Sequence, residues 1–328
     1  MRQLTVQDYE SGQRLDKYLN RYLKEAPRGF LYRMLRKKNI TLNGKKADGT
    51  EKLAAGDQNR LFLSEETVEK FMGSAPPRGR EAGARGAALR VLYEDADVLF
   101  LNKPAGMLSQ KAAPDDVSAC EHLIAYLMDE GSLTEETLRT FRPGVCNRLD
   151  RNTSGVLAAG KTTRGLRELS ALFRARAVDK RYLCLVAGTV EHSSRVSGYL
   201  TKEEQTNTVT VTAEPPGDPI ETEYRPLGTA EGFTLLEVRL ITGKTHQIRA
   251  HLASLGHPVL GDGKYGDEAV NRAFRQRLSL RHQLLHSWKL IFPEEVLTLP
   301  TLSGRAVTAP LPPHFQRCLR ELSLRTPK

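Results

Sequence analysis

The sequence FTLLEVRLITG occupies residues 233–243, and THQIRAHLASLG follows it at residues 245–256. The first stretch is rich in large and β-branched apolar residues, which are typical of a β-strand, and the second has the apolar spacing of a helix. Only Lys244 separates the two stretches. A strand that leads so directly into a helix predicts a domain that mixes α and β elements.

Similar strand-like runs recur earlier in the chain: VLYED (91–95), DVLFLNKP (97–104), RYLCLVAG (181–188) and TVTVT (208–212). They outnumber helical runs such as LRELSALFRAR (166–176) and do not alternate with them regularly. This pattern favours an α+β fold with a mixed, mainly antiparallel sheet over a doubly wound parallel one. No GxxxxGK[ST] or GxGxxG segment follows a strand, so a nucleotide cofactor is not indicated.

Length and charge limit the classes of function. A chain of 328 residues suggests two domains, and its net charge of +10 favours an acidic partner such as a nucleic acid or an anionic membrane surface. No stretch approaches the ~20 apolar residues of a membrane helix. The first ten residues lack the layout of a signal peptide, so we expect a cytoplasmic protein without a membrane partner.

The sequence does not predict a metal site. The four cysteines form no CxxC pair and are expected to be small core residues: Cys120, Cys146, Cys184 and Cys318. His246 and His251 are five positions apart, so they are not an i, i+4 metal pair on one helix face. Structural hydrogen bonding is the expected role of both histidines.

The segment GSAPPRGREAGARGAALR, residues 73–90, contains little that could be buried. It predicts a flexible basic linker between a small first domain, residues 1–72, and a larger second domain, residues 91–328. Its arginines are expected to be solvated spacers. Contact between this arm and phosphates is the alternative.

The first domain is expected to hold two helices and a small β element. RLDKYLNRYLKE (14–25) and GFLYRMLRKKN (29–39) have helical apolar spacing. ITLNGKKAD (40–48) follows them and carries the Asn-Gly signal of a tight hairpin at Asn43 and Gly44.

Seven basic residues and no acidic one lie between Arg28 and Lys46. Because every charged residue of this segment is positive, the segment is expected to bind phosphate groups rather than to form an ordinary solvent-exposed helix surface. RLDKYL, the basic helix and the turn that follows it resemble the small α/β RNA-binding module of ribosomal protein S-four type, over roughly Gly12 to Leu63. We predict RNA contacts at these basic residues: Arg28, Arg33, Arg36, Lys37, Lys38 and Lys45.

The candidate chemistry concentrates in NRLDRNTSGVLAAGKT, residues 147–162. Asp150 lies between Arg148 and Arg151, whose positive charge favours its ionised form. Neighbouring Asn, Thr and Ser side chains offer turn hydrogen bonds that can hold an irregular loop. These residues alone allow two roles for Asp150, a nucleophile or a carboxylate that caps a turn. Composition favours the turn cap slightly.

This segment resembles the H-R-L-D-x-x-T-S-G signature of RluA/RluC-type pseudouridine synthases. Three further segments resemble that family's blocks in the same order: LNKPAGMLSQ (101–110), KRYLCLVAG (180–188) and TGKTHQIRAHLASLGHPVLGDGKYG (242–266). With these four blocks, the resemblance extends over the second domain from about Leu89 to Pro293. The resemblance implies that the chain isomerises specific uridines to pseudouridine in RNA, most simply large-subunit ribosomal RNA, with transfer RNA as the alternative.

The resemblance also implies the site residues. It makes Asp150 the group that detaches uracil from ribose, Tyr182 the tyrosine against the target base, and Arg249 the partner that orients the nucleophile. Arg148 matches an arginine near the space that a flipped nucleotide leaves. Asn147 and Lys180, from the same blocks, are further expected substrate contacts. No metal or organic cofactor is implied, and we expect a monomer.

Two positions depart from the family pattern: Asn147 replaces a usual His, and Lys244 replaces a usual Arg. A non-catalytic RNA-binding or ribosome-assembly factor with the same fold is the competing hypothesis. The intact set of Asp150, Tyr182 and Arg249 favours the enzyme. A glycosidase-like base excision would require a second carboxylate beside Asp150, and the sequence has none there.

Overall fold

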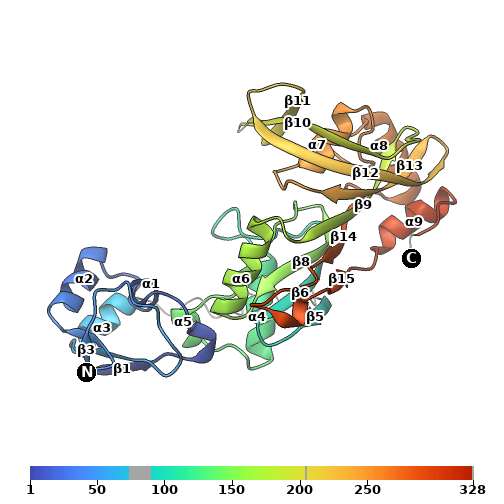
Figure 1. Ribbon diagram of the computed structural model, residues 1–328. Helices are drawn as coiled ribbons and strands as arrows, with labels where there is room; N and C mark the ends of the chain where they lie inside the picture. Colours follow the sequence, from blue (N-terminus) through green and yellow to red (C-terminus); the bar gives the residue numbers. More distant parts are fainter. Residues whose placement is uncertain (74–89, 204, 327–328) are drawn as a thin grey trace.

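The computed structural model describes residues 1–73, 90–203 and 205–326. A small sheet with three helices lies at one end of the molecule, and a much larger sheet occupies the rest (Figure 1). Most of the predicted linker, residues 74–89, lies outside the described residues.

The small part contains the two predicted helices and the predicted hairpin, together with a third helix, a short 3-10 helix and two strands that were not predicted. Its elements are β1 (Arg2–Thr5), η1 (Asp8–Glu10), α1 (Leu15–Tyr22), α2 (Arg28–Arg36), β2 (Ile40–Leu42), β3 (Lys45–Lys46), β4 (Gln58–Leu61) and α3 (Glu65–Met72). The strands pair antiparallel in the order β1-β4-β2-β3. Asn43 and Gly44, with φ angles of 51° and 73°, form the predicted hairpin turn. Leu15 and Leu19 of α1 pack with Leu35 of α2 in a separate core.

The larger part contains an 11-stranded sheet. Its first elements are β5 (Arg90–Glu94), β6 (Val98–Lys103), α4 (Ala119–Asp129), α5 (Thr137–Thr140), β7 (Gly144–Val145), β8 (Ser154–Gly160), α6 (Thr163–Arg174) and β9 (Asp179–Ala187). Then follow β10 (Ser194–Glu203), β11 (Thr208–Thr212), β12 (Asp218–Ala230), β13 (Phe233–Leu240), α7 (Gln247–Ser254), α8 (Glu268–Leu278), β14 (Leu285–Ile291), η3 (Pro300–Leu302), β15 (Ala306–Thr308) and α9 (Pro313–Glu321).

The order of this sheet is β11-β10-β12-β13-β9-β14-β8-β6-β5, with β15 beside β14 and β7 beside β8. Among the described strands, only β14 and β8 pair in parallel, so the expected mixed, mainly antiparallel sheet is confirmed. These two strands approach closely at Gly155. A Cβ atom there would lie 2.1 Å from the carbonyl oxygen of Ser287, so only glycine fits.

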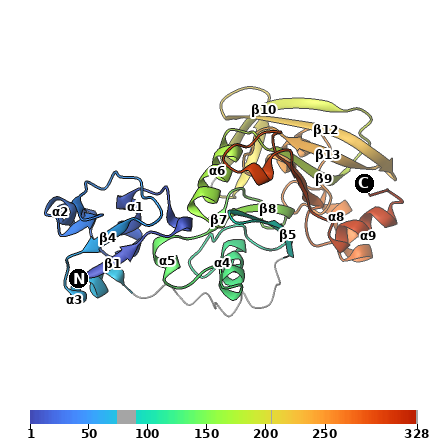
Figure 2. The same cartoon turned by 60° about the horizontal axis from the view of Figure 1, so that its bottom comes forward.

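Helices cover both faces of the sheet. Helices α4 and α6 lie on opposite sides of the sheet (Figure 2). Leu123 of α4 packs in the core on one face of β6 and β8, and Leu169 of α6 packs in the core on the other face. Along β9 the side chains alternate in the same way. Tyr182 points to the face that α7 covers, whereas Leu183 packs with the core formed by α8 and α9.

The two parts contact each other near α5. Arg21 of α1 donates a hydrogen bond of 3.4 Å to the carbonyl of Thr140, and the rings of Tyr9 and Phe141 lie 6.3 Å apart. The cysteines agree with the prediction of core positions, since Cys184 and Cys318 are buried and Cys120 and Cys146 pack partly buried against core clusters. None of the described helices is long and apolar enough to cross a lipid bilayer.

Candidate active site

Asp150 lies in the irregular segment between β7 and β8, and side chains hold this segment in place. Ser109 Oγ accepts a hydrogen bond from Leu149 N at 3.0 Å and donates to Leu149 O at 2.8 Å. Asn147 Oδ1 accepts from Ala158 N at 2.7 Å, and its Nδ2 donates to Val156 O at 3.3 Å. The amide of Asn147, where the family pattern has His, is therefore engaged with β8 and supports the loop.

Lys103 anchors the same loop from the protein interior. Its side chain is fully buried, and Nζ donates hydrogen bonds to the carbonyls of Pro104, Met107 and Arg151. Burial lowers the pKa of Lys103 to about 7, against the opposing effect of the Asp150 charge. Lys103 thus ties β6 to the residue that follows Asp150.

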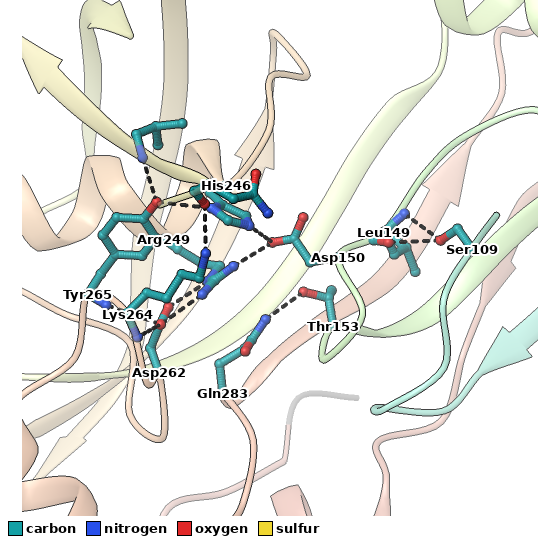
Figure 3. Close-up of polar contacts among 12 residues, drawn as sticks. Ser109, Leu149, Asp150, Thr153, His246, Arg249, Asp262, Lys264, Tyr265 and Gln283 are labelled. Carbon is teal, nitrogen blue, oxygen red and sulfur yellow. Dashed lines mark hydrogen bonds and ion pairs between the residues drawn. The ribbon is translucent and has the colours of Figure 1, made fainter. Parts of the chain in front are cut away.

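Arg249, on α7, connects two carboxylates (Figure 3). Its Nη1 donates to Asp150 Oδ2 at 2.9 Å, while Nε and Nη2 donate to the two oxygens of Asp262 at 2.6 and 2.8 Å. Burial opposes ionisation of Asp262, but its hydrogen bonds with Arg249 hold its pKa below the usual value. The orientation of Arg249 is therefore set by Asp262, and its Nη1 is left to donate to Asp150.

Two further aromatic side chains complete the polar cluster. His246 Nε2 lies 4.0 Å from Asp150 Oδ2, and its Nδ1 lies 2.9 Å from the Tyr265 hydroxyl. The guanidinium of Arg249 lies over the Tyr265 ring at 5.1 Å from its centroid. Burial lowers the pKa of His246 and favours the neutral ring.

Tyr182 lines a cavity of about 60 Å³ together with Asp150, Arg148 and Ile248. The tyrosine is 5% exposed, and burial raises the pKa of its phenol, so the group is protonated at neutral pH. A cleft of about 1050 Å³, which Asp150 and Arg148 also line, opens beside this cavity. The structure thus brings together Asp150, Tyr182 and Arg249, three residues from different parts of the chain.

Of the other predicted contacts, Arg148 lines both the cavity and the cleft, and Asn147 lines the cleft. Arg148 is exposed at the cleft, and Lys180 of β9 is half-buried with its pKa lowered by burial. The predicted basic residues of the small part are all exposed: Arg28, Arg33, Arg36, Lys37, Lys38 and Lys45.

Three residues of the site, Lys103, Asp262 and Tyr265, had no role predicted from the sequence. Each lies inside a quoted block, Lys103 in LNKPAGMLSQ and the other two in GDGKYG, so a signal was present. The sequence of a block does not indicate which residues elsewhere in the chain these side chains contact. Within the described residues, no three His, Cys, Asp or Glu side chains lie together in a way that could hold a metal ion.

The chain is similar to known proteins over most of its length. The sequence model of a family described as RNA pseudouridylate synthase matches residues 97–254. The ribosomal large subunit pseudouridine synthase C of Vibrio parahaemolyticus is 34% identical, over 86% of this chain and 85% of its own. The protein of the same name from Escherichia coli K12 is 32% identical, over 95% and 94%.

Among solved structures, human RNA pseudouridylate synthase domain containing 4 superposes with a TM-score of 0.59 at 22% identity, over 73% of this chain and 94% of its own. At this level of identity the likeness concerns the fold. It agrees with the large, mainly antiparallel sheet described above.

Proposed function

Because the chain belongs to the RNA pseudouridylate synthase family, whose members isomerise uridine to pseudouridine in RNA, we propose that Asp150 performs this chemistry on large-subunit ribosomal RNA. The observation that carries the proposal is the setting of the Asp150 carboxylate. Its side chain is 25% exposed at the cavity that Tyr182 lines, while Arg249, only 6% exposed, holds one of its oxygens. An anchored carboxylate that still reaches a cavity suits a nucleophile better than a turn cap.

The reaction requires the bond between ribose C1′ and uracil N1 to break and a bond between C1′ and C5 to form, while C5 loses a proton and N1 gains one, so that the product is an isomer of uridine. Asp150 Oδ2 accepts the hydrogen bond of Arg249, and Oδ1 accepts none from the described residues. We assign Oδ1 to the ribose, either in attack at C1′ or in an elimination route, because a carboxylate divides one difficult step into easier ones. This assignment needs neither a metal nor an organic cofactor.

Tyr182 is proposed to lie against the uracil ring. Its raised pKa keeps the phenol protonated, so it supplies an aromatic face and a neutral hydroxyl rather than a phenolate. Burial within the cavity fixes the plane of its ring. The detached uracil must turn before C5 faces C1′, and a flat apolar surface allows this movement while it excludes water.

The cationic side chains are proposed to bind RNA. We propose that Arg148, which is exposed beside Asp150, enters the stack that a flipped uridine leaves, and that Lys180 contacts a neighbouring phosphate. The basic face of the S-four-like small domain, residues 1–72, would anchor the RNA away from the catalytic centre. We propose that the enzyme acts as a monomer in the cytoplasm.

The test uses purified protein with unmodified large-subunit ribosomal RNA and, in a parallel reaction, unmodified transfer RNA. Pseudouridine should appear in the ribosomal RNA and be absent from the transfer RNA. Asp150→Asn should bind the RNA with unchanged affinity and produce no pseudouridine. If the wild-type protein bound RNA without making pseudouridine, the chain would be a binding or assembly factor, and an active Asp150→Asn protein would refute the mechanism.

A further inference from the structure

The hairpin of β10 and β11 is hydrogen-bonded to two residues of the active-site region, Lys264 and Tyr265, which lie two and three positions after Asp262. Lys264 Nζ donates hydrogen bonds to the carbonyls of Thr206 and Asn207 at 3.1 and 2.7 Å. The amide of Val209, in β11, donates to the Tyr265 hydroxyl at 2.8 Å. Asn207 and Lys264 also line the cleft beside Asp150, so the hairpin forms part of its wall.

The hydrogen bonds of Tyr265 favour one of the two neutral forms of His246. A phenol has one hydrogen to donate and lone pairs to accept with. Since the Val209 amide occupies a lone pair, the hydroxyl hydrogen is available for His246 Nδ1, which lies 2.9 Å away (Figure 3). A neutral His246 that accepts at Nδ1 must carry its hydrogen on Nε2.

This arrangement suits the groups around His246. Its Nε2 faces Asp150 Oδ2 at 4.0 Å, so an N–H group there points a positive pole at the carboxylate. The opposite tautomer would turn a lone pair toward the same negative charge. The other charged groups near the ring are Arg249, Lys264 and Asp262, and Arg249 and Asp262 already pair with each other.

We propose that Tyr265 is a positioning residue whose hydroxyl joins the β10–β11 hairpin to His246 and holds the Nε2–H group of His246 against Asp150. The position of the β10–β11 hairpin, which forms part of the wall of the cleft, is then coupled to the position of the Asp150 carboxylate. RNA that displaces the hairpin alters the setting of Asp150, and correct seating of the hairpin stabilises it. This inference rests on the role proposed for Asp150.

Tyr265→Phe tests the hydroxyl alone, because the ring keeps its contact with Arg249 and its packing against Val209 and Ala250. The single-turnover rate at saturating RNA should fall about tenfold, the usual scale for losing a hydrogen-bonded group, with the RNA dissociation constant changed less than about threefold. Tyr126→Phe is the matched control, since it removes a 2.8 Å hydrogen bond to Glu94 in the same domain. It should retain the wild-type rate. A wild-type rate in Tyr265→Phe would overturn the proposal.

A double-mutant cycle with His246→Ala separates this role from general structural support. If Tyr265 acts through His246, adding Tyr265→Phe to the His246→Ala protein should change the rate by less than about twofold. If the hydroxyl had only a structural role, Tyr265→Phe would lower the rate by the same factor in the wild-type and His246→Ala proteins. Equal reductions in the two proteins would therefore refute the proposal.

The tautomer is measured on the active wild-type enzyme by long-range ¹H–¹⁵N spectra of its histidine rings, with His246 assigned by its loss in His246→Ala. The hydrogen should lie on Nε2, and Tyr265→Phe should produce a mixture of tautomers. A wild-type ring protonated on Nδ1 would overturn the inference whatever the activity. Failure of the proposed function would be distinct, because the wild-type protein itself would then make no pseudouridine.

Discussion

Arg249 donates a 2.9 Å hydrogen bond to Asp150, although 99 positions separate the two residues in the chain. The same guanidinium forks onto Asp262, which is fully buried and also accepts the backbone amides of Lys264 and Tyr265. Asp150, the proposed nucleophile, is thus held by Arg249, and Asp262 holds Arg249 in place.

Asp262→Asn should damage both the fold and the reaction. The change leaves Arg249 buried without its main counter-charge, which typically costs about 3 to 5 kcal/mol of unfolding free energy. Pseudouridine formation should fall at least tenfold, because Arg249 can then turn away from Asp150. Urea unfolding and single-turnover assays measure the two effects. Glu268→Gln, which disturbs an exposed ion pair with Arg272, is the control and should change neither by much.

Lys103 should make stability depend on pH in a defined direction. Burial lowers its pKa to about 7 in the folded protein, while the unfolded chain keeps the ordinary value near 10.5. Between these values the unfolded state binds more protons, so this residue makes the free energy of unfolding rise with pH. Below pH 7 both states are protonated and the contribution is constant.

Lys103→Met removes this dependence, along with three hydrogen bonds to carbonyls. The difference in unfolding free energy between wild type and Lys103→Met should therefore increase from pH 7 to pH 9. Urea unfolding at several pH values measures it. A difference that stays constant over this range would show that Lys103 is not buried with a lowered pKa.

Arg148→Gln should slow base flipping without changing stability, because Arg148 is exposed. A cation that fills the vacated stack offsets part of the cost of extrusion, which is a few kcal/mol. The single-turnover rate should fall about tenfold, and the fluorescence of a 2-aminopurine placed beside the target should rise less on binding. Arg272→Gln, an exposed arginine on α8, should behave as wild type.

Neutralising the basic face of the small part should weaken RNA binding through electrostatics. With Arg33, Arg36 and Lys37 changed to Gln, the slope of log K against log salt should fall by roughly 0.7 to 0.9 for each phosphate that the protein no longer neutralises. Changing Arg272, Arg275 and Arg320 to Gln removes equal charge from α8 and α9. An equal reduction of the slope in this control would mean that net charge, rather than the basic face, governs binding.

The amino-acid sequence by itself determined the local features of this protein. Strand and helix runs follow from side-chain periodicity, and the turn at Asn43 and Gly44 follows from the φ angles that these residues tolerate. The ordered motif blocks were sufficient to indicate the family and to select Asp150, Tyr182 and Arg249. Motifs indicate the family because they record residue types at short spacing, which a single sequence displays directly.

Only the tertiary structure decided which distant groups act on one another. Asn147 is predicted to contact substrate and lines the cleft, and the structure adds that its amide binds the backbone of β8. His246 was given only a structural role, although its Nε2 faces Asp150. The contacts of Lys103 and of Asp262 depend on β6, β8 and α7 packing together. A hydrogen bond requires about 3 Å between its atoms, and chain folding sets that separation for residues far apart in the sequence.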